Sequence, residues 1–116
     1  MIDRYEAHRK EAVARVLGSA GDTPRFLRET VLAKAARLGG RTSAEPADVP
    51  TPLATYVERV ATEAHKVTDE DVVALRRAGY SEDAVFEITL CAALGTALGR
   101  LERGMDALHG RTHAAP

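Results

Sequence analysis

The chain of 116 residues has one cysteine, no tryptophan, three tyrosines and two phenylalanines. A single cysteine cannot form an internal disulfide, so the fold cannot depend on one. The longest strongly apolar run extends from Ile88 to Leu98 and is shorter than the ~18 residues that suggest a membrane span. No basic-then-apolar signal opens the sequence. We therefore expect a cytoplasmic protein that contains no membrane-spanning helix.

The charged residues are balanced and interspersed. Sixteen lysines and arginines stand against 17 aspartates and glutamates, which gives a net charge of -1. Without a long block of one sign, the sequence does not indicate nucleic acid or acidic lipid as a partner. A chain of this length can bury about two thirds of the surface that its unfolded form exposes, so a hydrophobic core is expected.

Apolar residues recur at helical spacing, and alanine, leucine, arginine and glutamate dominate, so we predict an all-α fold. The predicted bundle of about five helices spans residues 3–17, 24–38, 52–67, 69–78 and 82–108. Residues 1–110 form one predicted domain, and residues 111–116 form a flexible tail. Four signals mark helix starts: Thr23 before Pro24, the pair Thr51-Pro52, Thr68 with Asp71 three residues later, and Ser81.

The long final helix contains small residues where helices usually avoid them. Ile88, Ala92, Gly95 and Gly99 recur at three- and four-residue steps on one face, beside a second apolar face that includes Cys91 and Leu98. Each interior glycine costs about 1 kcal/mol relative to alanine unless another backbone comes close. We interpret the small-residue face as the interface of a homo-oligomer; the alternative is that both faces are covered within one chain.

The segment "VTDEDVVALRRAGYSEDAVFEITLCAALGTALGRL" resembles the C-terminal helical hairpin of the alkylhydroperoxidase D (AhpD)-like and carboxymuconolactone decarboxylase-like superfamily. "LRETVLAKAARLGG" resembles the helix that leads into the redox centre of that family. The resemblance implies an AhpD-like bundle that assembles as a trimer, a hexamer or another small homo-oligomer.

The redox centre that the resemblance implies is degenerate. Glu29 holds the position of the family's proton-relay glutamate, but Arg41, Ala44 and Asp48 stand where two cysteines and a histidine would be. Peroxide reduction by a dithiol needs a thiolate of low pKa and a resolving thiol nearby. Cys91 does not replace them, because apolar neighbours and the carboxylate of Glu87 disfavour its thiolate. We predict that the Cys91 side chain packs in the hydrophobic core and has no chemical role.

Three residues are candidates for acid–base catalysis: Glu29, Glu87 and His65. Glu87 has apolar sequence neighbours, so its carboxylate is expected to be protonated or paired, as a general acid or base or in a structural ion pair with Arg28, Arg59 or Arg100. Without the thiols, Glu29 is expected to form a salt bridge or a helix-terminus contact. His65 is expected to share a helix edge with Glu58 and Thr62, where it could polarise a small substrate, take part in a carboxylate–histidine metal site or simply be solvated.

The sequence contains no glycine-rich phosphate loop, cysteine cluster or nucleophile elbow, so we predict no cofactor and no metal. His109 and His113 have the spacing of a metal pair but lie at the fraying end of the chain. The sequence favours a homo-oligomeric binding or accessory protein without dithiol chemistry. The alternative is a thiol-independent enzyme acting on a small organic acid or a related metabolite, and alkylhydroperoxidase activity has the least support.

Overall fold

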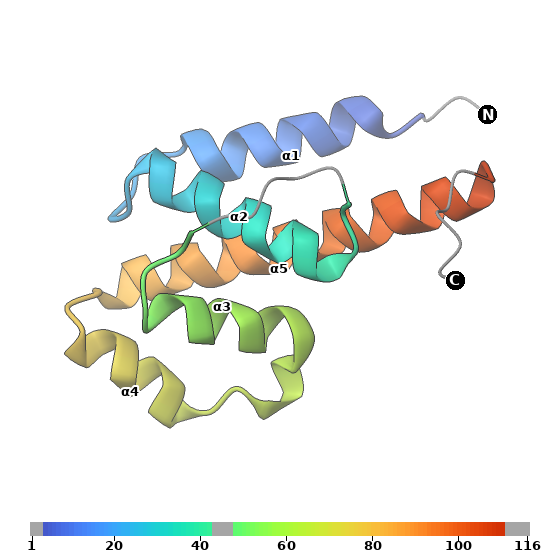
Figure 1. Cartoon of the computed structure of the whole chain (residues 1–116). Helices are drawn as coiled ribbons and strands as arrows, with labels where there is room; N and C mark the ends of the chain where they lie inside the picture. Colours follow the sequence, from blue (N-terminus) through green and yellow to red (C-terminus); the bar gives the residue numbers. More distant parts are fainter. Residues whose placement is uncertain (1–3, 43–47, 111–116) are drawn as a thin grey trace.

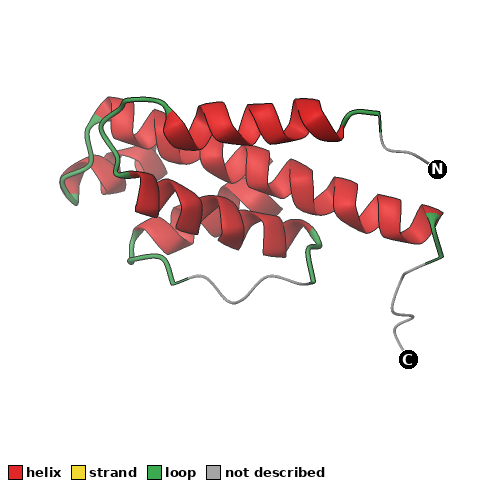
Figure 2. Cartoon of the chain, turned by 90° about the horizontal axis from the view of Figure 1, so that it is seen from above, coloured by secondary structure: helices red, strands yellow, loops and turns green. Residues whose placement is uncertain are grey.

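The computed structural model describes residues 4–42 and 48–110, and they form helices joined by short turns (Figures 1 and 2). The elements are α1 (Glu6–Gly18), α2 (Arg25–Gly39), α3 (Leu53–Thr62), the short 3-10 helix η1 (Ala64–Lys66), α4 (Asp69–Arg77) and α5 (Glu82–Leu108). The predicted all-α architecture with a long last helix is confirmed. The predicted tail, residues 111–116, lies outside the described residues.

Helix α5 runs through the middle of the molecule, and α2 lies along it (Figure 1). In the same view α1 lies on one side of this pair, while α3 and α4 lie on the other. The hydrophobic core draws its buried side chains mainly from α2, α3 and α5, including Val31, Leu53, Val57, Ile88 and Cys91, each fully buried. None of the residues in α1 is fully buried, so this helix covers the core without contributing to its centre.

Local signals place the last helix where the sequence predicts it. The Ser81 hydroxyl accepts the backbone N–H of Ala84 at 3.0 Å and caps the start of α5. Two residues before Ser81, Gly79 adopts φ +104°, a conformation that favours glycine and reverses the chain between α4 and α5. Before α4, the Asp71 carboxylate accepts the backbone N–H of Thr68 at 2.9 Å.

Several predicted boundaries differ from the structure; the first helix, expected from residue 3, begins at Glu6. The third helix was expected to continue to residue 67, but α3 ends at Thr62 because Glu63 leaves the helical region with φ -144° and ψ 48°. The second was expected to begin at Pro24 with Thr23 as its cap. It begins instead at Arg25, with Pro24 in the cap position, and the Thr23 side chain bonds elsewhere.

The backbones of α2 and α5 lie against each other at three glycines. A Cβ atom added to Gly95 would lie 2.3 Å from the Leu32 carbonyl oxygen, and one added to Gly99 would lie 2.0 Å from that of Ala36. From the other helix, a Cβ on Gly39 would lie 2.4 Å from the Thr96 carbonyl oxygen. These distances are too short for any side chain, so the glycines allow the two helices to touch.

This contact corrects the interpretation of the small-residue face. Ile88 and Ala92 are fully buried, and Gly95 and Gly99 are buried beside them, all within one chain. The close backbone that the glycines require belongs to α2. The alternative left open by the sequence, that both apolar faces of the last helix are covered within one chain, accounts for these four residues.

By length and composition alone, α5 could also cross a membrane, and it is the only such helix among the described residues. Of the most apolar 18-residue window, 44% is buried inside the bundle. The core helix of a bundle meets the same criterion, and its contacts with α2 and α3 account for much of this apolarity.

Candidate functional site

Glu87 and Arg28 meet at the point where α1, α2 and α5 come together. The Glu87 carboxylate accepts the backbone N–H groups of Asp22 and Thr23, both at 2.9 Å, and the Thr23 hydroxyl at 2.5 Å. The Arg28 guanidinium lies 3.4 Å from the same carboxylate. Of the two predicted roles for Glu87, the structure therefore shows the ion pair, with Arg28 as the partner.

Arg28 is 4% exposed, and its donors are directed at nearby acceptors. Its Nε donates to the Thr23 hydroxyl at 2.9 Å, and its Nη1 donates to the carbonyl oxygens of Val16 and Ser19. These carbonyls lie at and beyond the end of α1, where helix carbonyls lack partners of their own. Arg28 thus closes the end of α1, while Glu87 holds the chain just before α2.

The hydrogen bonds at Glu87 set its charge state. Burial raises the pKa of the Glu87 carboxyl, but the three hydrogen bonds from Thr23 and Asp22, together with the positive charge of Arg28, lower it by more. The net effect is a pKa below the ordinary value of 4.5. Glu87 is therefore a carboxylate at neutral pH, with both oxygens occupied by donors, whereas a general base needs a pKa near the working pH and access to substrate.

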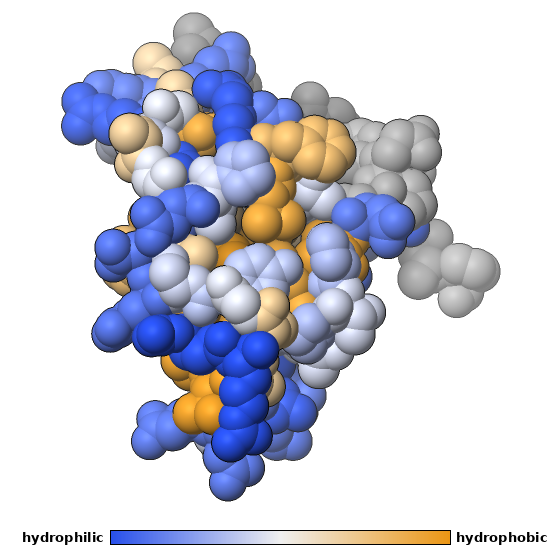
Figure 3. Space-filling view, turned by 90° about the vertical axis from the view of Figure 1, so that its left-hand side faces the viewer, coloured by the Kyte–Doolittle hydropathy of each residue, from blue (hydrophilic) through white to orange (hydrophobic). Residues whose placement is uncertain are grey.

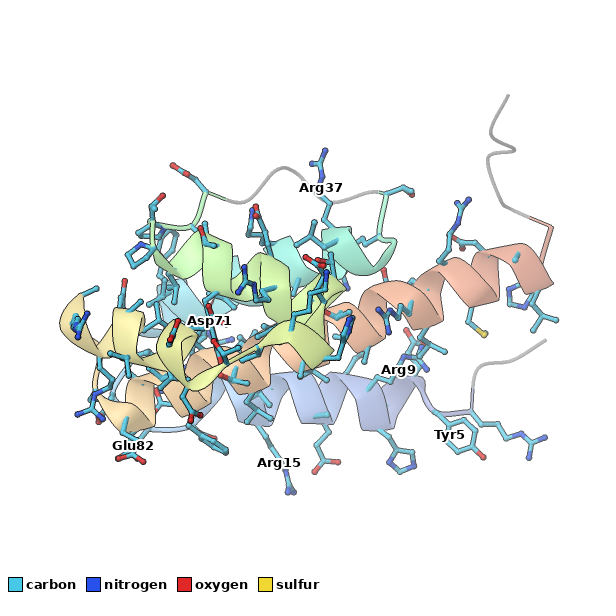
Figure 4. The ribbon with its side chains drawn as sticks, turned by 90° about the horizontal axis from the view of Figure 1, so that it is seen from below. Tyr5, Arg9, Arg15, Arg37, Asp71 and Glu82 are labelled. Carbon is cyan, nitrogen blue, oxygen red and sulfur yellow. The ribbon has the colours of Figure 1, made fainter. Side chains whose placement is uncertain are left out.

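A cavity of about 380 Å³ opens beside this ion pair, between α1 and the first half of α5. Its lining includes Arg28 and Glu87, the apolar side chains of Val16, Phe86 and Leu90, and the charged side chains of Arg15 and Asp83. Arg15 on α1 and Glu82 at the start of α5 point to the same side of the molecule (Figure 4). The end of the molecule that carries the α1–α2 and α4–α5 turns is largely hydrophilic, with apolar side chains visible between the charged ones (Figure 3).

Cys91 is fully buried in the core on α5. Burial raises the pKa of its thiol to about 11; the nearby charge of Glu87 adds to this effect, and that of Arg28 opposes it. A thiol with this pKa is almost entirely protonated at neutral pH and is a poor nucleophile. The structure therefore agrees with the interpretation of Cys91 as packing.

The other two acid–base candidates lie apart from this cluster. Glu29 is exposed on α2, where its carboxylate pairs with Arg25 at 2.7 Å, one turn away. His65 is exposed on η1, and because α3 ends at Thr62 it does not continue the helix edge of Glu58. Glu58 pairs instead with Lys34 of α2 at 3.1 Å. The structure does not bring Glu29, Glu87 and His65 together.

Of the three positions that the resemblance aligns with two cysteines and a histidine, Arg41 and Asp48 are described. Arg41 binds Glu102 of α5 through two hydrogen bonds of 2.8 and 2.5 Å, which raise the pKa of its guanidinium against a smaller opposing effect of burial. Asp48 is exposed, and Ala44 lies outside the described residues, as does His113. Within residues 4–42 and 48–110, no three His, Cys, Asp or Glu side chains gather as a metal site.

The face of α5 opposite Gly95 and Gly99 carries an apolar stripe that was not identified from the sequence. We call it the outer stripe; it consists of Phe86, Leu90, Ala93, Ala97 and Leu101. All five are exposed, with 66% of Phe86, 43% of Leu90 and 40% of Leu101 open to solvent. Their steps of four, three, four and four residues place them on one helix face and are visible in the sequence.

A groove runs beside the second half of the outer stripe, between α5 and the end of α3. We call it the alanine groove; it has a volume of about 490 Å³ and is lined by Val60, Ala61, Thr62, Ala64, His65, Ala93, Thr96, Ala97 and Arg100. Arg100 lies at its edge and donates to the Ala61 carbonyl oxygen at 3.5 Å. The surface of α5 is thus bulky at Phe86 and Leu90 and hollow beside Ala93 and Ala97.

Comparison of the chain with protein-family models, with curated proteins and with solved structures finds no match in any of the three.

Proposed function

We propose that the chain is a small helical binding or accessory protein that works as a homo-oligomer, without dithiol chemistry, and that its outer stripe is the assembly surface. The observation that carries the proposal is the exposure of Phe86 and Leu90 in a continuous row with Ala93, Ala97 and Leu101. Contiguous apolar surface of this kind is typical of a site of association. Resemblance of the last two helices to AhpD-like proteins, which form homo-oligomers, supports the same proposal.

The internal cluster favours a structural role over catalysis. The hydrogen bonds of Glu87 and Arg28 hold the two ends of the α1–α2 connection in place. Cys91 is buried and protonated, and Glu29 and His65 are exposed on separate elements. An enzyme acting on a small organic acid would need these groups to converge on a substrate. Their separation favours the binding or accessory protein.

A second copy of this chain is the occupant that fits the outer stripe best. The surface that has to be covered contains large exposed side chains at one end and a groove lined by alanines at the other. Two copies can therefore satisfy each other, with the large side chains of each in the groove of the other. A symmetric pair formed through one self-complementary surface is also the commonest closed assembly.

The direct test compares two variants at apolar positions of equal exposure. Leu90 in the outer stripe and Val73 on α4 are each 43% exposed. We expect Leu90→Lys to convert the assembled protein to monomer and Val73→Lys to leave its mass unchanged, measured by native mass spectrometry and sedimentation velocity. A wild-type protein that remains monomeric, or an assembly that survives Leu90→Lys, would contradict the proposal.

A further inference from the structure

We infer that two copies of the chain pair through antiparallel α5 helices related by a twofold axis, with Phe86 and Leu90 of each copy opposite Ala97 and Ala93 of the other. This inference rests on the proposed function, because it assigns a geometry to the surface proposed there. It follows from three features of the outer stripe: the order of large and small residues, the spacing between them, and the charges at its two ends.

The order of residues decides the direction of pairing. From the start of α5, the stripe presents the large side chains of Phe86 and Leu90 first, then the small ones of Ala93 and Ala97, and last the large side chain of Leu101. Parallel helices would place Phe86 against Phe86 and leave the alanine groove empty. Antiparallel helices place each large side chain against a small one, which lets the helices approach and fills the groove.

Four of the five residues of the stripe fit a single register, in which the fifth, Leu101, falls opposite Glu82. Phe86 and Leu90 are four residues apart, as are Ala93 and Ala97. When Phe86 lies opposite Ala97, Leu90 therefore lies opposite Ala93 without any shift. The groove beside Ala93 and Ala97, about 490 Å³ in volume, is large enough to accept the Phe86 ring of the other copy.

The same register pairs opposite charges. Asp83 lies three residues before Phe86, and Arg100 lies three residues after Ala97, so Asp83 of one copy falls opposite Arg100 of the other. Asp83 is exposed at the edge of the cavity that Arg15 also lines. Arg100 is exposed at the edge of the groove and holds only one long hydrogen bond, to Ala61. A twofold axis forms this charge pair twice.

Disulfide cross-linking distinguishes the antiparallel pair from other arrangements. Phe86 and Ala97 lie eleven residues apart, about 16 Å along the helix at 1.5 Å per residue. A disulfide requires Cα atoms within about 7 Å. In the inferred dimer, Phe86→Cys can therefore cross-link only with Ala97→Cys, and neither variant can cross-link with itself.

The experiment mixes the two single variants, allows subunits to exchange, oxidises the mixture mildly and separates it on a non-reducing gel. We expect about tenfold more cross-linked dimer from the mixture than from either variant alone, given that distance limit. Wild-type protein, whose Cys91 is buried, is the control and should give no cross-link. Asp83→Cys mixed with Arg100→Cys leaves every apolar residue of the stripe in place and should give the same pattern.

Each other outcome has a defined meaning. Cross-links within Phe86→Cys alone and within Ala97→Cys alone would indicate parallel helices and overturn the inference. An assembly that depends on Leu90 but gives no cross-link in either mixture would also overturn it, while the proposed function would stand. A monomeric wild-type protein, or one that adheres to lipid vesicles rather than to itself, would overturn both.

Discussion

Thr23 donates both its backbone N–H and its hydroxyl to the Glu87 carboxylate, at 2.9 and 2.5 Å, across 64 positions of the chain. Hydrogen bonds to a charged acceptor are stronger than those between neutral groups. Together with Arg28, this contact joins the end of α1, the approach to α2 and the first turns of α5. It gives a polar anchor to a bundle whose core is built from apolar side chains.

Glu87→Gln is expected to destabilise the protein by about 2–3 kcal/mol, since hydrogen bonds to charged groups contribute roughly that much. The amide of glutamine carries two donors where Glu87 has only acceptors, so one of the donors from Asp22 or Thr23 loses its partner. Glu29→Gln is the matched control; its exposed salt bridge should contribute less than about 0.5 kcal/mol. Urea unfolding of both variants checks this, and equal effects would contradict the anchoring role.

The contribution of Glu87 should depend on pH. Its pKa is lower in the folded protein than its ordinary value of 4.5, so the stabilisation is fully present above that pH and is lost as pH falls through the folded pKa. The difference in unfolding free energy between wild type and Glu87→Gln should therefore stay constant above about pH 5.5 and shrink below about pH 4.5. A difference that grows on acidification would show that the carboxylate is not stabilised by folding.

Two glycines of α5 should respond oppositely to alanine. Gly95→Ala places a Cβ 2.3 Å from the Leu32 carbonyl oxygen and should destabilise by about 1–3 kcal/mol, because a packed backbone must move. Gly104 has no atom within 4 Å of a Cβ position, so Gly104→Ala should stabilise by about 0.5–1 kcal/mol. Thermal and urea unfolding compare the two. Tolerance of Gly95→Ala would indicate that α2 and α5 lie further apart.

Cys91 should be unreactive in the folded protein. A pKa of about 11, against an ordinary 9.0, reduces the thiolate fraction at neutral pH by about a hundredfold, and burial restricts access as well. Alkylation by iodoacetamide at about pH 7.5 should therefore be at least a hundredfold slower than in urea-unfolded protein. Comparable rates in the two states would reopen thiol chemistry for this chain.

Charge reversal tests the ends of the inferred dimer interface. Asp83→Arg or Arg100→Asp alone should weaken self-association by about tenfold, since each places like charges opposite one another. The chain carrying both substitutions restores the opposite charges and should recover to within about threefold of wild type. Sedimentation equilibrium measures the dissociation constants of wild type and the three variants, and additive losses in the double variant would remove this charge pair from the interface.

The helices themselves could be predicted because their signals are local. The Ser81 cap and the turn at Gly79 define the start of α5, and the periodicity of apolar residues continues to its end at Leu108. The glycines at 95 and 99 correctly indicated a close backbone. They could not indicate whose backbone it was, because spacing within one helix carries no information about its partner.

Long-range contacts explain what sequence reasoning missed. The partners of Glu87 are 59 to 65 positions away in the sequence. Three arginines were candidates for its ion pair, and the three-dimensional structure is needed to identify Arg28 as the partner. The end of α3 was also missed, because neither glycine nor proline lies between Thr62 and Val67 to mark it. The outer stripe was visible in the sequence, but an apolar row is recognisable as uncovered only when the positions of all its neighbours are known.

Because α1 contains no fully buried residue, we expect it to have lower local stability than the helices that form the core. Regions with few buried contacts open locally at low free energy, while tightly packed elements open only with the whole fold. Amide hydrogens in the middle of α2 and α5, where the backbones touch, should exchange last, and those in the first turns of α1 should exchange soon after transfer to D₂O. Arg28 limits this fraying from the other end, because it donates to the carbonyl of Val16 in the last turn of α1 and to that of Ser19 just beyond it. Helix α1 is thus held at its C-terminal end against the tightly packed helices α2 and α5, and we expect it to open from its N-terminal end.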